Sequence, residues 1–181
     1  MNLNDGLFGC LGERYQDKVG DDEYQREELL LDELPDKFNE GTWELDDIVT
    51  ILEWKNEKRF REHNISRFLE NNSEREIQKF VDGAIKHRNL TNKLESLREL
   101  EQIGVATSSA ILLFMDPGRY TVFDTKAWDV LRESNLVSAD YDSDSIEQYL
   151  LYLGICRALA AQYDVELRDL DRMLWVIGGE L

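Results

Sequence analysis

The stretch that decides the fold runs from residue 100 to residue 112 and reads LEQIGVATSSAIL. Leucines recur at helical spacing over residues 90–100 and predict a helix that ends near residue 100. A tight turn at Ile103 and Gly104 follows, and a second helix opens with small residues that let the two helices pack closely. The amide groups at the start of such a helix, beside a glycine, form a site suited to a phosphate. The alternative is that this segment is a helix–helix corner with a packing role and no phosphate contact.

Apolar residues recur at helical spacing along most of the chain, which predicts an all-α fold in a single domain, residues 1–181. Pro35 is expected to end the first clear helix, and Thr42 is the expected N-cap of the second. Residues 120–123 could be extended. The predicted helices cover residues 23–34, 44–55, 73–85, 90–100, 107–115, 124–131, 146–163 and 168–176.

The charge is strongly acidic and unevenly distributed. The chain has 21 Lys and Arg against 38 Asp and Glu, a net charge of −17. Residues 1–50 carry 4 basic and 15 acidic groups, with an acidic segment over residues 1–40, while residues 51–134 are neutral overall. A polyanion can therefore approach the central part if the ends point away or salt screens them. A halophilic source is one origin of such acidity, and an ordinary acidic protein or a DNA mimic is another.

Several classes of protein are excluded by composition. Two cysteines and two histidines are too few for a cysteine zinc site, an iron–sulfur cluster, a disulfide framework or a histidine-rich metal site, so no metal or cofactor is expected. Cys10 is typical of a surface thiol and Cys156 of a buried one. No apolar run approaches the roughly 18–20 residues of a membrane span, and the first residues do not resemble a secretion signal. We therefore expect a cytoplasmic location and no membrane partner.

The decisive stretch, together with Val122-Phe123-Asp124-Thr125, resembles the helix-hairpin-helix DNA glycosylase superfamily. The family hairpin reads LPGVGxxTA, and a catalytic aspartate follows its second glycine at a similar distance to the 20 residues that separate Gly104 from Asp124. The likeness covers residues 97–131 and is clearest to small prokaryotic members with a GVATASA-type hairpin. A weaker match extends upstream over residues 45–55, where Trp54 and Lys55 occupy the family positions that fill the gap left by the extruded base. It implies a two-lobed helical bundle that binds duplex DNA and hydrolyses the N-glycosidic bond of an extruded damaged or mismatched base.

The resemblance implies that Asp124 is the catalytic residue, ionised beside the flipped nucleotide, where it stabilises the oxocarbenium-like sugar and orients a water. The alternative is that Asp124 only caps the helix that begins at Thr125, although one carboxylate can do both. The hairpin residues that the resemblance assigns to a DNA phosphate are Gln102, Gly104, Ala106 and Thr107.

The sequence departs from the family pattern at several positions. Gln102 replaces the first hairpin glycine and Glu101 replaces the proline, and both changes are expected to weaken phosphate binding. Ala106 stands where the lyase members carry a lysine, so no Schiff base can form there and a glycosylase would be monofunctional. Lys126 replaces a family histidine. It either contacts a DNA phosphate or lies on a solvated face.

Residues 54–61, WKNEKRFR, are the most basic window and have interleaved aromatics. In the functional interpretation Trp54 is a stacking wedge that fills the gap left by the base, and Lys55, Lys58, Arg59 and Arg61 contact phosphates. The alternative is a helix C-terminus, where basic residues complement the dipole and Trp54 anchors the core.

Other conspicuous residues are expected to be structural. Trp128 and Trp175 lie at helical spacing with apolar neighbours and are predicted to pack in the core. The Asp and Arg side chains of residues 168–175 are predicted to form surface ion pairs of small value.

Three hypotheses follow from the sequence. The first is a monofunctional DNA glycosylase, which cannot be assigned a base from sequence. The second keeps the fold but not the chemistry, as a DNA-binding or damage-sensing module. The third is an acidic helical interaction protein on the same scaffold, which would retain no DNA at any salt concentration.

Overall fold

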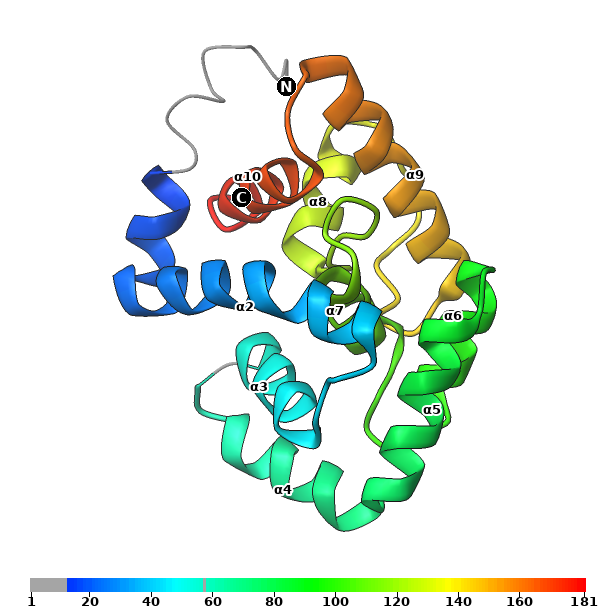
Figure 1. Cartoon of the computed structure of the whole chain (residues 1–181). Helices are drawn as coiled ribbons and strands as arrows, with labels where there is room; N and C mark the ends of the chain where they lie inside the picture. Colours follow the sequence, from blue (N-terminus) through cyan, green and yellow to red (C-terminus); the bar gives the residue numbers. More distant parts are fainter. Residues whose placement is uncertain (1–12, 57) are drawn as a thin grey trace.

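The computed structural model describes residues 13–56 and 58–181, and all of their regular structure is helical (Figure 1). The predicted all-α fold class is therefore confirmed for this part of the chain, whereas the expectations for Cys10 and the start of the acidic segment lie outside the described residues. Residues 13–19 are helical. The helices that follow are α2 (Asp21–Glu40), α3 (Leu45–Lys55), α4 (Arg61–Asn71), α5 (Glu74–Lys86), α6 (Leu90–Arg98), α7 (Val105–Met115), α8 (Thr125–Glu133), α9 (Ile146–Tyr163) and α10 (Leu167–Gly178).

Helix α7 lies at the centre of the molecule and packs against α2, α3, α6 and α9. It is apolar on every side, and all of its residues except Ala106 and Thr107 are buried. A helix that is apolar all round belongs in a core, where small residues such as Ser108 and Ala110 allow neighbouring helices to come close. The hairpin predicted from residues 100–112 thus supplies the central helix of the fold.

The other helices form two groups around α7. Figure 1 shows α3, α4, α5 and α6 on one side of α2 and α7, and α8, α9 and α10 on the other. Within the first group α3 packs on α4 and α5 on α6, and within the second α10 packs on α8 and α9. No helix in the described part of the chain is long and apolar enough to cross a membrane.

The prediction that Pro35 ends a helix is wrong. Helix α2 continues through Pro35 to Glu40, and both Leu34 and Phe38 are buried on either side of the proline. The apolar area that these two side chains bury outweighs the hydrogen bond that proline removes from the helix. The helix ends at Gly41, whose left-handed conformation (φ 72°) lets its amide bond to the Lys37 carbonyl.

The start of helix α3 and the presence of helix α4 also differ from the sequence-based expectation. The N-cap of α3 is Glu44 rather than Thr42, because Asp47 accepts a hydrogen bond from the Glu44 amide at 2.8 Å and closes a capping box. Helix α4 was not predicted, since Phe68 is its one buried residue and, apart from Ile65 and Leu69, the rest of its sequence is polar. Residues 120–123, which the sequence analysis gave as a possible extended segment, belong to neither helix nor strand.

Candidate functional site

Asp124 ends a segment that is anchored to the central helix. The Phe123 amide donates to the Ser109 hydroxyl of α7 at 2.8 Å, and the Phe123 ring is fully buried. Directly after it, Asp124 Oδ1 accepts a hydrogen bond from the Lys126 amide at 2.9 Å and caps α8. The capping role proposed for Asp124 is therefore confirmed, and it fixes one oxygen of the carboxylate.

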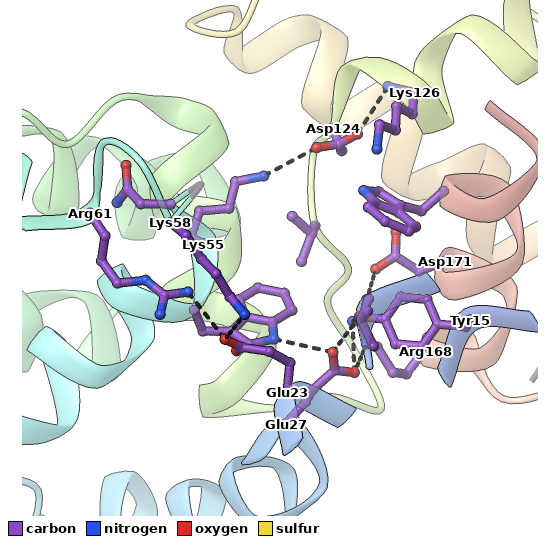
Figure 2. Close-up of a pocket in the computed structure, with 15 residues that line it drawn as sticks. Tyr15, Glu23, Glu27, Lys55, Lys58, Arg61, Asp124, Lys126, Arg168 and Asp171 are labelled. Carbon is purple, nitrogen blue, oxygen red and sulfur yellow. Dashed lines mark hydrogen bonds and ion pairs between the residues drawn. The ribbon is translucent and has the colours of Figure 1, made fainter. Parts of the chain in front are cut away.

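The second oxygen of Asp124 lies beside a cleft. Its Oδ2 atom is 3.5 Å from Lys55 Nζ, which reaches across from the end of α3 (Figure 2). Both side chains are largely buried, with exposed fractions of 27% for Asp124 and 18% for Lys55. The cleft has a volume of about 360 Å³, within the usual range of small-molecule sites. The carboxylate thus caps a helix and faces a cavity at the same time.

The floor of the cleft is a buried ion network centred on Glu27 of α2. Glu27 Oε1 accepts hydrogen bonds from Arg168 at 2.7 Å and Arg172 at 2.6 Å, both on α10. Its Oε2 accepts from Tyr15 Oη at 2.5 Å and from Trp54 Nε1 at 3.1 Å. Burial alone raises the pKa of Glu27, but the two guanidinium charges and the Tyr15 hydrogen bond together hold the pKa below its ordinary value.

This network contradicts the prediction of surface ion pairs along residues 168–175. Arg168, Asp171 and Arg172 are all at most 7% exposed. Asp171 pairs with Arg168 and accepts a hydrogen bond from the Tyr152 hydroxyl at 3.1 Å, and burial raises its pKa. The prediction failed because the face of α10 that carries these groups is covered by α2, whose Glu27 lies more than 140 residues away in the chain.

Aromatic side chains form the walls of the cleft. Trp54 is half-buried, packs edge-on against Phe114 with ring centroids 5.0 Å apart, and is tied to Glu27 by its indole N–H. Trp175 also lines the cleft, and Lys126 Nζ lies 3.7 Å from the centroid of its ring. Trp128, in contrast, is fully buried, as predicted. Trp54 and Trp175 are partly buried and pack against the core, as the structural alternatives predicted, and both also line the cleft.

The basic window of residues 54–61 lies only partly at the cleft. Lys55 and Lys58 line it together with Arg61, whereas Arg59 is exposed, does not line it and has its guanidinium 4.5 Å from the centroid of the Phe60 ring. Lys126 lines the opposite side of the cleft (Figure 2). Of the predicted DNA contacts outside the hairpin, the cleft that Asp124 lines thus gathers Trp54, Lys55, Lys58, Arg61 and Lys126.

The hairpin residues do not line this cleft, and the backbone amides of the hairpin already bond to an acidic loop of the same chain. Its Val105 amide donates to Asp144 Oδ1 at 3.1 Å, and its Ala106 amide donates to the Ser143 carbonyl at 3.0 Å. Gln102 adopts the left-handed conformation (φ 72°) that the family glycine would adopt without strain. Gln102 and Thr107 line a second, smaller pocket of about 170 Å³. Phosphate binding by Gln102, Gly104, Ala106 and Thr107 stays a prediction.

The chain matches no protein-family model, no curated protein and no solved structure. Within residues 13–56 and 58–181, no group of three or more His, Cys, Asp or Glu side chains is arranged to hold a metal ion.

The cleft combines three features that suit one kind of ligand. Aromatic walls accept a flat ring, the Asp124 carboxylate faces any positive charge that develops beside it, and Lys55 and Lys126 flank that carboxylate with cations. Sequence reasoning missed the floor residues, which are Tyr15, Glu27, Arg168 and Asp171. The one signal for them is the group of charged residues on the otherwise apolar α10, at positions 168, 169, 171 and 172.

Proposed function

We propose that this protein is a monofunctional DNA N-glycosylase that hydrolyses the N-glycosidic bond of a damaged or mismatched base extruded from the duplex. The observation that carries the proposal is the placement of Asp124. One of its oxygens is held by the amide of Lys126, and the other faces a cleft with aromatic walls. A carboxylate held in this way is preorganised toward a point in the cleft rather than free to turn.

The arrangement fits the charge changes of the reaction. When the base leaves with the bonding electrons, positive charge develops on the sugar, and a fixed carboxylate beside the sugar lowers the free energy of that state. An extruded base lies with its ring between the aromatic walls formed by Trp54 and Trp175. The sugar then lies at the mouth of the cleft, beside Asp124.

The ion pair between Lys55 and Asp124 has to open in this scheme. At 3.5 Å the two groups are not in tight hydrogen-bonding contact, and Lys55 extends from the last turn of α3. An incoming DNA phosphate offers Lys55 another anion, so substrate binding frees the Asp124 carboxylate for the sugar. Lys55 then contributes to DNA binding, as the basic window of residues 54–61 predicts.

The overall arrangement of helices is consistent with this function. The cleft is lined by α3 and α4 from one group of helices and by α8 and α10 from the other, with α2 between them. A cleft between two groups of helices supports the proposal, because the resemblance to helix-hairpin-helix glycosylases implies a two-lobed bundle.

The test is base release by Asp124→Asn compared with the wild type. Asparagine caps helices as well as aspartate does, so this variant keeps α8 and removes only the charge. Duplexes that contain uracil, hypoxanthine, 8-oxoguanine, adenine mismatches or alkylpurines are incubated with each protein at high salt. We expect the wild type to release the base from one of these duplexes. Asp124→Asn is expected to release that base at least about 10²-fold more slowly.

Asp129→Asn is the matched control, because it makes the same change on α8 at a residue whose carboxylate pairs with Arg132 and does not line the cleft. Its rate of base release is expected to equal that of the wild type. Equal rates for wild type and Asp124→Asn would show that Asp124 is only a cap.

A non-catalytic damage sensor is the second candidate. It is favoured by the partners that both Asp124 oxygens already have within the chain, the Lys126 amide and Lys55. A sensor binds duplexes that carry a lesion but releases no base from any of them. Measuring binding and base release on the same set of duplexes separates the two functions.

A further inference from the structure

Arg61 has a buried donor that no group in the described structure accepts. It is the first residue of α4, its side chain is 20% exposed and it lines the cleft. Its Nε atom is buried and has no hydrogen-bond partner among residues 13–56 and 58–181. Leaving such a donor unpaired is unfavourable, and more so for a charged group, so proteins rarely do so without a reason.

The ion pairs that Arg61 does make are loose. Arg61 Nη2 lies 3.6 Å from Glu23 Oε1, and Lys58 Nζ lies 3.4 Å from the same oxygen. Charge-assisted hydrogen bonds are normally about 2.7–2.9 Å long. For comparison, the buried pair of Arg172 and Glu27 is 2.6 Å apart. One carboxylate oxygen therefore serves two cations, neither at contact distance (Figure 2).

A phosphate ester matches these donors better than Glu23 does. A phosphate group has several oxygens arranged around one atom, so it can accept from Nε and Nη2 of a guanidinium and from a nearby ammonium at once. Glu23 lies on α2 and approaches Arg61 and Lys58 with a single oxygen. The second Glu23 oxygen is in no ion pair that the described residues make.

We propose that Arg61 and Lys58 form a phosphate-ester subsite at the rim of the cleft, and that Glu23 is the internal carboxylate that the phosphate replaces. The inference rests on the proposed function in that the phosphate belongs to the nucleotide whose base enters the cleft. It moves the main phosphate contact from the hairpin, where the amides of Val105 and Ala106 are engaged, to the corner between α3 and α4.

The phosphate can come from a DNA backbone or from a free nucleotide, and two probes distinguish these sources. The first is a duplex that carries one tetrahydrofuran residue, an abasic analogue with no base to release. The second is 2′-deoxyadenosine 5′-monophosphate. Binding of the duplex is followed by fluorescence anisotropy at several salt concentrations, and binding of the nucleotide by calorimetry.

The variants are Arg61→Gln and Glu23→Gln, each with a matched control. Arg67→Gln removes the same charge from an exposed position of α4, and Asp22→Asn removes an exposed carboxylate next to Glu23. We expect Arg61→Gln to weaken duplex binding about tenfold and to reduce the slope of log K against log salt by about 1, while Arg67→Gln leaves both unchanged. Glu23→Gln is expected to strengthen binding more than Asp22→Asn does.

The outcomes separate this inference from the proposed function. The subsite is overturned if Arg61→Gln binds both probes as tightly as Arg67→Gln does. It is also overturned if Glu23→Gln binds them no more tightly than Asp22→Asn does. Either result overturns the subsite even when base release is observed. If the nucleotide binds in an Arg61-dependent way and the duplex does not bind, the subsite stands and the glycosylase proposal falls.

Thermal unfolding checks that the variants are folded. Should Arg61→Gln fail to fold, Arg61→Lys keeps the charge and removes the Nε donor. It is expected to bind the duplex more weakly than the wild type, and wild-type affinity in Arg61→Lys would overturn the subsite.

Discussion

Glu27 is the residue on which the floor of the cleft depends. It is 1% exposed and joins Tyr15, Trp54 and the two arginines of α10 through its two oxygens. Because each arginine is buried as well, neither can recover its hydration if the carboxylate is removed. The charge of Glu27 is therefore more important for stability than that of an exposed acidic residue.

We predict that Glu27→Gln lowers the free energy of unfolding by about 3–5 kcal/mol, the usual cost of leaving a buried partner uncompensated. Glu28→Gln is the control, because Glu28 also pairs with Arg172 but its side chain is 48% exposed. Glu28→Gln is expected to lower the free energy of unfolding by less than about 1 kcal/mol. Urea unfolding of the three proteins measures the difference, and similar losses for both variants would contradict the assignment.

The same residue gives the sign of a pH dependence. The folded protein holds the pKa of Glu27 below its ordinary value, so Glu27 binds a proton more readily in the unfolded chain. Its contribution to stability is present above the ordinary pKa of 4.5 and is lost as the pH falls through the lower folded value. Between pH 7 and pH 3, the free energy of unfolding is expected to fall more steeply in the wild type than in Glu27→Gln.

Residue spacing predicted one half of the site and not the other. Asp124 could be found because its distance from Gly104 and its place before Thr125 are both visible in one short segment. Glu27 could not be found, because nothing near it distinguishes it from the other acids of α2. Its partners, Arg168 and Arg172, come from the far end of the chain.

At the level of elements, helix α10 is fixed to α8 by a close backbone approach. A Cβ atom added to Gly178 would lie 2.1 Å from the Lys126 carbonyl oxygen, so no larger residue fits unless the two helices separate. Lys126 and Trp175, which border this contact, both line the cleft. The packing of these two helices therefore sets the width of the cleft on that side.

We predict that Gly178→Ala destabilises the protein by about 1–3 kcal/mol or more through overpacking. Gly154→Ala is the control, since Gly154 lies in α9 with nothing within 4 Å of an added Cβ. There, alanine is expected to raise stability by roughly 0.5–1 kcal/mol through its higher helix propensity. Thermal unfolding compares the two, and opposite shifts are expected. A shift of the same sign in both variants would count against the close approach.

Helix prediction succeeded where the pattern was apolar and failed where it was polar or interrupted. The central helix α7 is evident from its uninterrupted apolar run, although it begins at Val105 rather than residue 107. Helix α4 was missed because only Phe68 is buried in the core and Ile65 is its one other apolar contact with it. Pro35 misled the prediction because local backbone preference is weaker than the burial of Leu34 and Phe38.

For the whole molecule, the net charge of −17 is a source of self-repulsion that salt screens. The Debye length falls from about 10 Å at 0.1 M salt to about 3 Å at 1 M. Many of the ion pairs are exposed, such as that of Arg132 and Asp140. Exposed pairs contribute little to the free energy of unfolding, so their screening by salt costs little stability. Screening is therefore expected to stabilise the folded state more than it weakens these pairs.

We predict that the thermal midpoint rises between 0.1 M and 1 M KCl, by about 2–4 °C for each kcal/mol of repulsion that is removed. Equal concentrations of NaCl are the control for specific ion effects and are expected to give the same rise. A midpoint that falls with salt would mean that attractive ion pairs outweigh the repulsion.

The cleft draws its floor from distant parts of the chain, since Tyr15 and Glu27 meet Arg168 on α10. A ribosome that makes this protein therefore completes most of the helices before the binding cavity can exist. Until α10 emerges from the exit tunnel, the nascent chain holds a carboxylate without its arginines and has no competent pocket. Ligand binding in the cleft can thus begin only after translation has passed that helix.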